Sequence, residues 1–505
     1  MKVKDLIKKL EHEEVIGFSD VDIKDIAYNS ARVKKGSCFV AIRGTRADGH
    51  QFINEACRAG AAAIVSDHPI RSLEGTCNIV VSDTSLALAR ISSEFFGNPS
   101  AMMRIMGITG TNGKTTITYI IESVLKCLKR DPGVIGTVNC RYKDVQLESQ
   151  NTTPMSYDLH KLLSKMQKAA VKDVVMEVSS HALEQRRVEG IEFDAALFTN
   201  LSHDHLDYHD GLEGYFKAKS LLFSEFLPAS SKKQKVAVAN AFDPYGQKIL
   251  AAAKRHKGID TFSFGANSKA DVFVEEFKAL KGGSSLKIKS PWGTLGCFTS
   301  LKGDFNAQNI AAATALLGGL GVPLEKIKNG IELLDSVPGR LEEIRSPKGF
   351  SVFVDYAHTP DAIKKVSETL KNLTHGKLII VFGCGGDRDR AKRPVMGNVA
   401  ASLGDIVIVT SDNPRTEDPS KIISDILAGI KKSGLKTLGA NGHGYLVEED
   451  RKKAICCAIE KAQEGDIVLI AGKGHETYQI VGKEVRHFDD REEVRKLVPS
   501  LSRDV

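Results

Sequence analysis

The 505-residue chain lacks an apolar run long enough to span a membrane. A membrane helix needs about 18 consecutive apolar residues, and every apolar run in this chain is shorter. Residues 1–10 mix lysines with valine, leucine and isoleucine, and they lack the apolar core of a signal peptide. We therefore expect a cytoplasmic protein that has no contact with a membrane.

The chain also lacks any C-x-x-C pair, and its nine cysteines are an odd number. In a chain of this length, such a pattern argues against a disulfide framework. We expect reduced thiols, which agrees with a cytoplasmic location.

Clusters of basic residues are absent as well, because 70 Lys and Arg residues are interspersed with 63 Asp and Glu residues. A nucleic-acid-binding protein typically gathers its basic residues beside aromatic ones. The net charge of +7 is mild for 505 residues. We therefore expect small anionic molecules as partners and no nucleic acid.

The most informative segment that is present is Gly110–Thr116, which reads Gly-Thr-Asn-Gly-Lys-Thr-Thr. An apolar run precedes it, and the apolar residues from Ile117 to Leu128 have the spacing of one helix face. In such a loop the backbone N–H groups face a polyphosphate at the helix N-terminus. The Lys114 ammonium can then reach the terminal phosphates, and the Thr115 hydroxyl can bind Mg²⁺.

The loop departs from a standard P-loop in one position. Ile108 stands where the first glycine belongs, and Gly107 lies one residue earlier. We nevertheless expect ATP to contact the whole loop, which consists of Gly110, Thr111, Asn112, Gly113, Lys114, Thr115 and Thr116.

Length and composition divide the chain into three regions. Residues 1–100 mix short apolar strands with small-residue turns and end at the turn cluster Gly97–Ser100. Residues 101–338 contain the phosphate loop. Residues 339–505 alternate apolar strands with helical or glycine-rich segments, which predicts a doubly wound parallel sheet.

The expected fold is therefore α/β with three domains. These are a small N-terminal α/β domain, a central P-loop-type ATP-binding α/β domain and a C-terminal Rossmann-like doubly wound domain. The strands that we expect are residues 38–42, 62–65, 79–81, 174–178, 195–198, 350–354, 377–382, 405–410 and 466–471.

Residues suited to a cation site follow the phosphate loop in the sequence. Glu177 ends an apolar strand, where a buried carboxylate needs a positive partner. Three histidines and two aspartates lie between His203 and His209. Zinc is one interpretation, but the spacing differs from an H-E-x-x-H arrangement. Mg²⁺ prefers oxygen ligands, and beside a phosphate loop we favour Mg²⁺ that binds together with ATP.

The distinctive polar residues of the third region follow its expected strands. In a doubly wound sheet, ligands bind at the carboxyl ends of the strands. The residues at these ends are Asp355, His358, Arg388, Asp412 to Arg415, and Gly472 to Glu476. A Gly-Cys-Gly-Gly segment also follows a strand, but Arg388 occupies the third glycine position of a dinucleotide motif. We therefore do not expect a nicotinamide site.

Six motifs, in their order along the chain, resemble the Mur ligases. They are Gly-Thr-Asn-Gly-Lys-Thr-Thr (110–116), Glu-Val-Ser-Ser-His (177–181), Asn-x-x-x-Asp-His-x-Asp (200–207), Tyr-x-x-Ala-Lys (215–219), Pro-Gly-Arg (338–340) and Gly-Lys-Gly-His-Glu (472–476). The displaced glycine of the loop is also a trait of this family. The resemblance implies an ATP-dependent ligase that activates a carboxylate as an acyl phosphate, which an amino group then attacks. It further implies that the substrate is a UDP-N-acetylmuramoyl-dipeptide, a precursor of peptidoglycan, and we expect a monomer.

The resemblance assigns catalytic roles to Lys114, Glu177, His205 and Lys219. Thr115, Glu177 and His205 match magnesium ligands of the family, and Lys219 matches a lysine that CO₂ converts to a carbamate. A bare ammonium would repel Mg²⁺, whereas the anionic carbamate of Lys219 can bind it.

The resemblance also implies two sets of nucleotide contacts. Those to the UDP-substrate are Ser30, Asn151, Thr152, Thr153, Ser179, Gln185 and Arg187. Those that complete the ATP site are Asn309, Arg340, Asp355 and His358. The donors in the UDP-substrate set suit uracil, pyrophosphate and carboxylate oxygens.

The segment Asp412, Asn413, Pro414 and Arg415 resembles the family motif that recognises meso-diaminopimelate. The Arg415 guanidinium can hold the distal carboxylate of this amino acid with two parallel hydrogen bonds. L-Lysine has no carboxylate there and would leave Arg415 unpaired. The resemblance adds Arg388, Gly472 and Glu476 to the amino-acid site. A plain type I turn is the structural alternative for the motif.

Three other functions remain open at this point. The first is the same ligation with L-lysine as the acceptor. The second is a folylpolyglutamate synthetase-like ligase, which would lack Asp412 to Arg415 and the domain that contains Ser30. The third is an ATP-binding regulatory protein without catalysis, which the joint presence of the four catalytic residues disfavours.

Overall fold

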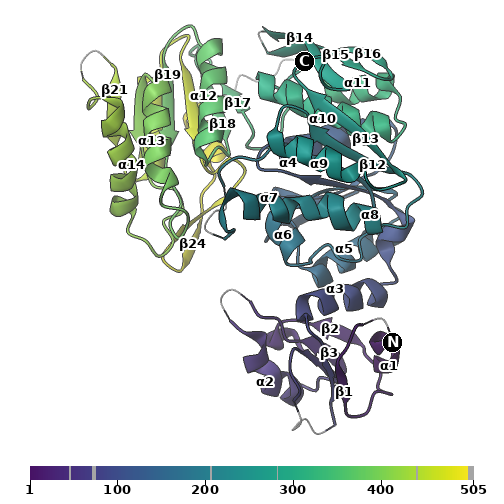
Figure 1. Cartoon of the computed structure of the whole chain (residues 1–505). Helices are drawn as coiled ribbons and strands as arrows, with labels where there is room; N and C mark the ends of the chain where they lie inside the picture. Colours follow the sequence, from purple (N-terminus) through teal and green to yellow (C-terminus); the bar gives the residue numbers. More distant parts are fainter. Residues whose placement is uncertain are drawn as a thin grey trace.

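The computed structural model describes residues 1–8, 10–44, 47–70, 75–204, 208–280, 282–439 and 442–498. Three α/β units follow one another along the chain, each around its own sheet (Figure 1). All the expected strands are present, and their ends differ from the prediction by two residues at most. The predicted three-domain α/β fold is confirmed, and we keep 1–100, 101–338 and 339–505 as proposed domain limits.

The first unit has a five-stranded sheet in the order β1-β5-β4-β3-β2. Its strands are β1 (Glu14–Ile16), β2 (Asp25–Ala27), β3 (Ser37–Val40), β4 (Ala63–Ser66) and β5 (Cys77–Val80). Helices α1 (Val3–Ile7) and α3 (Thr84–Phe95) pack on one face, and α2 (Ile53–Arg58) packs on the other. Because both faces are covered, β3, β4 and β5 are buried along their whole length.

The central unit has an eleven-stranded sheet in the order β16-β15-β14-β13-β12-β11-β6-β10-β7-β8-β9. Its strands are β6 (Arg104–Thr109), β7 (Gly133–Ile135), β8 (Asn139–Tyr142), β9 (Val145–Glu148), β10 (Asp173–Glu177), β11 (Phe193–Phe198), β12 (Lys235–Asn240), β13 (Ile259–Gly265), β14 (Val272–Leu280), β15 (Gly283–Ser290) and β16 (Gly293–Thr299). The middle strands are parallel, and antiparallel pairs form both edges. Because β6 lies between β11 and β10, its carboxyl end lies well inside the sheet.

Helices cover both faces of the central sheet. Helices α4 (Lys114–Cys127), α10 (Asp304–Gly319) and α11 (Leu324–Glu332) pack on one face. Helices α5 (Ser156–Lys168), α6 (Ser180–Glu184) and α9 (Pro244–Ala253) pack on the other. Helix α7 (Gly211–Leu221) continues through a π turn (Leu222–Phe226) into α8 (Leu227–Ala229). The helix predicted after the phosphate loop is α4, and its apolar face is fully buried.

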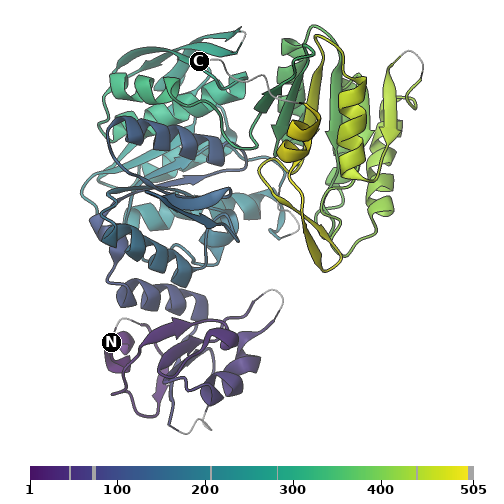
Figure 2. The same ribbon diagram turned by 180° about the vertical axis from the view of Figure 1, so that it is seen from behind.

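The third unit has a six-stranded sheet in the order β17-β18-β22-β19-β20-β21. Its strands are β17 (Glu342–Arg345), β18 (Ser351–Asp355), β19 (Leu378–Phe382), β20 (Ile406–Val409), β21 (Gly444–Val447) and β22 (Ile467–Ala471). Helices α12 (Pro360–Leu373), α13 (Lys392–Leu403) and α14 (Pro419–Ser433) cover one face, and α15 (Arg451–Lys461) and α16 (Asp490–Leu497) cover the other (Figures 1 and 2). A hairpin of β23 (Tyr478–Val481) and β24 (Glu484–His487) follows β22. The sheet is doubly wound, as predicted.

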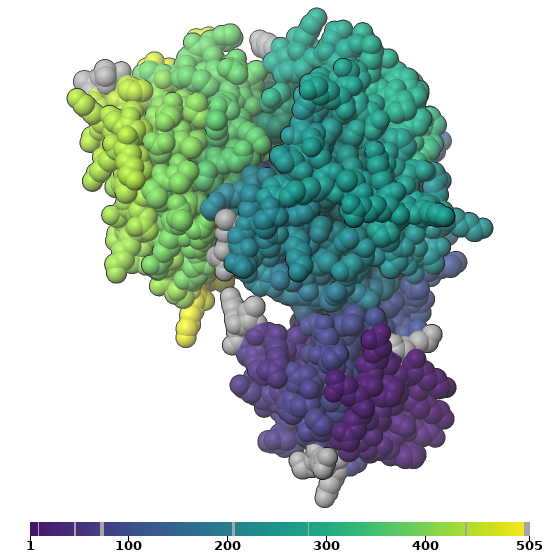
Figure 3. Space-filling view, in the orientation of Figure 1, coloured from purple at the N-terminus to yellow at the C-terminus, as the bar shows by residue number. Residues whose placement is uncertain are grey.

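The central and third units lie side by side, and the first unit extends from one end of the central unit (Figures 1 and 3). The Tyr157 hydroxyl donates to Asp25 at 2.7 Å, which ties the central unit to the first. The Asn112 side-chain amide donates to Asp361 at 3.1 Å, which ties it to the third. Within the described residues, no helix is long and apolar enough to cross a bilayer.

Candidate active site

The phosphate loop follows β6, and α4 begins at Lys114. Gly110 and Gly113 have φ values of +136° and +92°, which favour glycine. A Cβ on Gly113 would lie 2.5 Å from Asn309 Oδ1, so the helix that carries Asn309 also requires glycine there. The Thr199 hydroxyl and the Asn200 amide donate to the Asn112 carbonyl at 2.6 and 3.2 Å. These contacts fix the loop with its backbone N–H groups at the start of α4.

Lys114 and Lys219 meet at one carbonyl of this loop. The Nζ atoms of both lysines lie 2.9 Å from the Gly110 oxygen, and Lys114 also donates to Thr111 at 2.9 Å. Lys219 comes from α7 and is 1% exposed. Burial lowers its pKa well below the usual value of a lysine, and the Lys114 charge lowers that pKa further. The Lys219 amine is therefore held toward its neutral form.

Glu177 ends β10 beside the loop and is 1% exposed. Its carboxylate accepts from the Thr115 hydroxyl at 3.2 Å, and from the Thr137 hydroxyl and backbone N–H at 2.9 and 3.0 Å. Gly136 leaves room for this carboxylate, because a Cβ there would lie 2.5 Å from Glu177 Oε1. Thr137 was not among the predicted site residues, and its only sign in the sequence is its place after the short strand β7, which neighbours β10. His205 lies outside the described residues.

The residues predicted to contact the UDP-substrate form a chain that leads to Glu177. The Thr152 hydroxyl bonds that of Thr137 at 3.1 Å, and the Thr153 hydroxyl donates to the Glu177 carbonyl at 2.9 Å. The Ser179 N–H donates to that same Thr153 hydroxyl at 3.0 Å.

Arg187 and Gln185 continue the chain toward the first unit. The Arg187 guanidinium donates to Thr153 O at 3.0 Å and to Gln185 Oε1 at 2.7 Å. Asn151 is exposed next to this group. Ser30 begins a short 3₁₀ helix of the first unit, and Tyr28, two residues earlier, donates to Asp158 of α5. The predicted set therefore spans the junction between the first and central units.

A cavity of about 1020 Å³ lies between the central and third units. Its walls include residues Thr111 to Thr116 and Asn309 from the central unit, and Arg340, Asp355 and His358 from the third. Arg340 donates to the Thr115 hydroxyl at 3.0 Å, and its guanidinium lies 4.5 Å from the Tyr356 ring centroid. The residues predicted to hold ATP are thus brought together from both units. Gly110 is the exception, because it does not line the cavity.

Asp355 and His358 stand at the carboxyl end of β18. Asp355 accepts the N–H groups of Leu341 and Ala357 at 2.7 Å each, and burial raises the pKa of its carboxyl. His358 Nδ1 lies 2.7 Å from the Tyr356 carbonyl oxygen. Asp355 therefore shapes the turn that presents His358 to the cavity.

The predicted amino-acid residues gather at the ends of β20 and β22, which the strand order brings near each other. Asp412 is buried and accepts the Asn413 N–H at 2.6 Å, and Asn413 donates from its side chain to Glu476 at 2.9 Å. Gly472 has a φ of +118°, and a Cβ there would lie 2.7 Å from Asp412 Oδ2. Pro414 packs against the loop after β19, because a Cβ on Gly386 would lie 1.9 Å from the Pro414 oxygen.

Two arginines from different segments lie near Gly385, beside this group of residues. Arg415 has a φ of +52° and donates to the Gly386 carbonyl at 2.6 Å. Arg388 is exposed and donates to the Asp387 carbonyl at 2.9 Å. Burial lowers the pKa of Arg415, and the Arg388 charge lowers it further. Two cations that repel each other in one pocket favour an anionic ligand between them.

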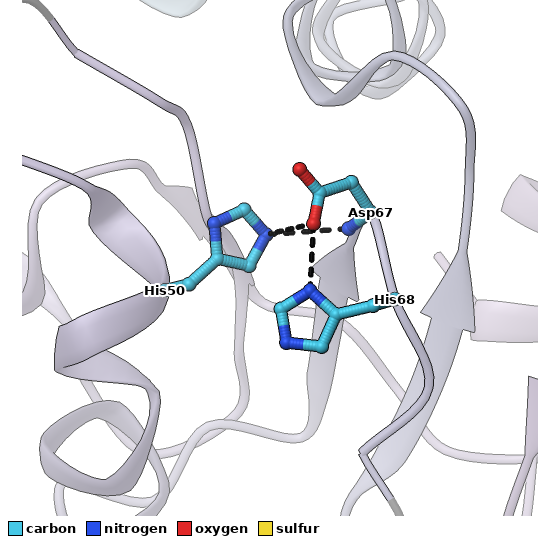
Figure 4. A group of neighbouring side chains, drawn as sticks. All are labelled: His50, Asp67 and His68. Atoms are coloured by element: carbon cyan, nitrogen blue, oxygen red, sulfur yellow. Dashed lines mark hydrogen bonds and ion pairs between the residues drawn. The ribbon is translucent and has the colours of Figure 1, made fainter.

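A separate group in the first unit has the composition of a metal site (Figure 4). His50, Asp67 and His68 bring their ligand atoms within 4.8 Å of one another. However, His50 Nε2 already accepts the Asp67 N–H at 3.2 Å, and Nδ1 lies 2.6 Å from Asp48. Arg43 donates to Asp67 at 2.5 Å. These bonds account for the group as a structural network, and it is distinct from the magnesium site predicted beside the phosphate loop.

Comparisons with known proteins cover all three units. Residues 22–96 match the model of the Mur ligase family catalytic domain, residues 108–317 the Mur ligase middle domain, and residues 339–474 the Mur ligase glutamate ligase domain. A UDP-N-acetylmuramoyl-L-alanyl-D-glutamate–2,6-diaminopimelate ligase of Geobacter metallireducens is 43% identical over 510 residues, which cover 99% of each chain.

Solved structures give the same picture. A structure of a UDP-N-acetylmuramoyl-L-alanyl-D-glutamate–2,6-diaminopimelate ligase has a TM-score of 0.69 and 32% identity, with 98% of each chain covered. A folylpolyglutamate synthase of Mycobacterium tuberculosis in complex with ADP has a TM-score of 0.64 over 78% of this chain and 93% of that one. At 19% identity, the second likeness concerns the fold alone.

Proposed function

This chain belongs to the Mur ligase family, and from that premise we propose that it joins meso-diaminopimelate to UDP-N-acetylmuramoyl-L-alanyl-D-glutamate at the expense of ATP. The observation that carries the proposal is a cluster of side chains in the third unit, where Arg415, Asn413 and Glu476 converge beside Asp412, and we call this cluster the acceptor pocket. Because the reaction consumes ATP, we propose that the enzyme is cytoplasmic, and we further propose that it acts as a monomer.

ATP would lie in the cavity between the central and third units. The backbone N–H groups at the start of α4 and the Lys114 ammonium would hold its phosphates. Arg340 would approach the γ-phosphate from the third unit, since it already reaches Thr115 at 3.0 Å. Asn309, Asp355 and His358 would hold the rest of the nucleotide. Two units supply the site, so binding of ATP would favour the arrangement in which they meet.

The donor set beside the loop fits Mg²⁺. Thr115 and Glu177 offer the oxygen ligands that Mg²⁺ prefers, and their oxygens lie 3.2 Å apart. Lys219, as an amine held neutral by burial, would react with CO₂ to give an anionic carbamate, and His205 would complete the set. When bound, Mg²⁺ would offset the negative charge on the transferring phosphoryl group.

The proposed reaction has two steps. A carboxylate of the UDP-substrate attacks the γ-phosphorus of ATP, which forms an acyl phosphate and releases ADP. The amino group of the acceptor then attacks the acyl carbon, the new C–N bond forms, and the C–O bond to phosphate breaks. Ser179, Thr152, Thr153, Gln185 and Arg187 would hold the UDP-substrate so that its carboxylate faces Glu177 and the loop.

The acceptor pocket would select diaminopimelate by charge. Arg415 and Arg388 would bind the carboxylate at the far end of the amino acid, and Glu476 would pair with an ammonium. Lysine lacks that carboxylate and would leave the two guanidinium groups without a partner. A folylpolyglutamate synthetase would not need these two arginines. A folylpolyglutamate synthetase-like function is therefore a weaker alternative than addition of diaminopimelate.

One assay separates these functions. Release of phosphate from ATP is measured with purified full-length protein, with the UDP-dipeptide and diaminopimelate each omitted in turn. We expect release that requires both compounds and is at least about 10³-fold more efficient with diaminopimelate than with lysine. Equal turnover with lysine would assign the lysine-adding function, and turnover with a folate substrate alone would refute the proposal.

A further inference from the structure

One fully buried cation has no part in the reaction described above. Lys473 follows Gly472 after β22 and is 0% exposed. Its Nζ donates to Asn413 Oδ1 at 3.1 Å and lies 3.6 Å from Glu476 Oε2. A buried ammonium is costly unless it is paired, and here its partners are two residues of the acceptor pocket.

The bond from Lys473 determines how Asn413 is oriented. An ammonium can only donate, so Asn413 must turn its oxygen toward Lys473. The same oxygen accepts the Ile480 N–H at 3.0 Å. The amide nitrogen of Asn413 is then left to donate to Glu476 Oε2, which it does at 2.9 Å. Lys473 thus fixes the position of Glu476 both directly and through Asn413.

Lys473 also balances two carboxylates that share one buried site. Burial raises the pKa of Glu476, the Asp412 charge raises it further, and Lys473 is the largest influence that lowers it. The groups that face Glu476 from the surrounding segments are Asp412, Arg415, Arg451, Lys473, Tyr356 and Tyr478. Arg451 is committed to Asp490, with two hydrogen bonds of 2.8 Å. Lys473 is therefore the cation that bears most directly on Glu476.

We propose that Lys473 is a positioning residue for the acceptor: it holds Asn413 and Glu476 in place and keeps the Glu476 carboxylate anionic, so that Glu476 can pair with the ammonium of the incoming amino acid. This inference rests on the function proposed above. Lys473 does not line the cavity in which ATP is proposed to bind.

The test uses full-length Lys473→Met and measures kcat and KM for diaminopimelate between pH 7 and pH 9. We expect the KM of the variant to rise by about tenfold or more at pH 7, with kcat and the KM values for ATP and the UDP-dipeptide changed less. The difference from wild type should shrink as the pH rises, because a higher pH favours the ionised form of Glu476 even without Lys473. Lys483→Met, in the exposed turn between β23 and β24, is the matched control and should behave as wild type.

The outcomes are distinct. A wild-type enzyme that does not use diaminopimelate overturns the proposed function, and this inference with it. An active wild type beside a Lys473→Met enzyme with an unchanged KM, or with a KM raised equally at every pH, overturns the inference alone.

If Lys473→Met does not fold, the double variant Lys473→Met/Glu476→Gln is compared with Glu476→Gln. Both of these variants lack the Glu476 carboxylate, so Lys473 has no carboxylate there to hold or to keep ionised. The KM for diaminopimelate should therefore differ between the two variants by less than about twofold. An additional loss of about fivefold or more in the double variant would overturn the inference.

Discussion

Replacement of Arg415 tests the acceptor pocket most directly. Its side chain is half-buried, one N–H already donates to Gly386 at 2.6 Å, and Arg388 stands near enough to lower its pKa. In the proposed complex, the remaining N–H groups hold the distal carboxylate of diaminopimelate. A hydrogen bond to a charged group contributes about 1.5 to 3 kcal/mol, and 1.36 kcal/mol corresponds to tenfold. Loss of the paired contact should therefore lower kcat/KM for diaminopimelate by about 10²-fold or more.

The backbone at Arg415 decides which variants to compare. Its φ of +52° is unfavourable for any residue with a Cβ. Arg415→Ala removes the guanidinium and keeps this strain, whereas Arg415→Gly removes both, and the glycine variant should be more stable by about 1 kcal/mol. Both variants should lose the same activity, because both lack the guanidinium. Arg415→Lys should also lose most of it, since an ammonium cannot form the paired contact.

The assay measures kcat and KM for diaminopimelate and for lysine, with thermal unfolding as a second reading. The KM values for ATP and the UDP-dipeptide should not change, because Arg415 belongs to the acceptor pocket. Discrimination against lysine should shrink, although efficient use of lysine need not appear. If Arg415→Ala keeps its full preference for diaminopimelate, the distal carboxylate is bound elsewhere, and Arg388 becomes the first residue to test.

Three further outcomes are expected. Lys219→Ala should be nearly inactive and partly rescued by short carboxylic acids, and a mass spectrum of active enzyme in bicarbonate that shows only an unmodified Lys219 would exclude the carbamate. Gly136→Ala should lower kcat at least about tenfold, because the added Cβ would lie 2.5 Å from Glu177 Oε1. Gly296→Ala is the control, since its Cβ would have open space and its kcat should not change. Equal kcat values for the two variants would refute the placement of Glu177. Burial lowers the pKa of His160 to about 4, so the unfolded chain binds a proton at this histidine more readily than the folded chain does. The free energy of unfolding should therefore fall by up to about 3 kcal/mol as the pH falls from about 6.5 to 4. His160→Gln should show a smaller loss of melting temperature between pH 7 and 5, and an equal loss would contradict this account.

The nine expected strands were predictable because buried strands are short apolar runs that differ from the helical spacing around them. Asp355, Asp412 and Gly472 were predicted to lie at one edge of a sheet, because each follows a strand of the same sheet. The contact of Asn112 with Asp361 was not predictable, since 249 residues separate them and no spacing rule relates separate units.

Other features escaped prediction for local reasons. Thr137 follows a strand of only three residues, β7, which gives too weak a pattern to mark a strand end. Lys473 stands between two glycines, where a lysine usually indicates a solvated turn, and its complete burial follows from the way β22 meets the loop after β20. The positive φ of Arg415 is also invisible in the sequence, because arginine rarely adopts it.

The Nζ atoms of Lys114 and Lys219 both lie 2.9 Å from the Gly110 carbonyl oxygen and are therefore close to each other. Because of this closeness, protonation of one lysine disfavours protonation of the other. Once one of them carries a proton, a second charge at the same oxygen is disfavoured, so the pair holds its first proton far more tightly than its second. Burial lowers the pKa of both lysines, but Glu177 raises that of Lys114 whereas the Lys114 charge lowers that of Lys219 further, so the proton is favoured on Lys114. The loop thus holds one amine toward its neutral form without a separate base. A substitution that neutralises Lys114 would remove one of the two influences that lower the pKa of Lys219, so that one mutation would alter two functional groups.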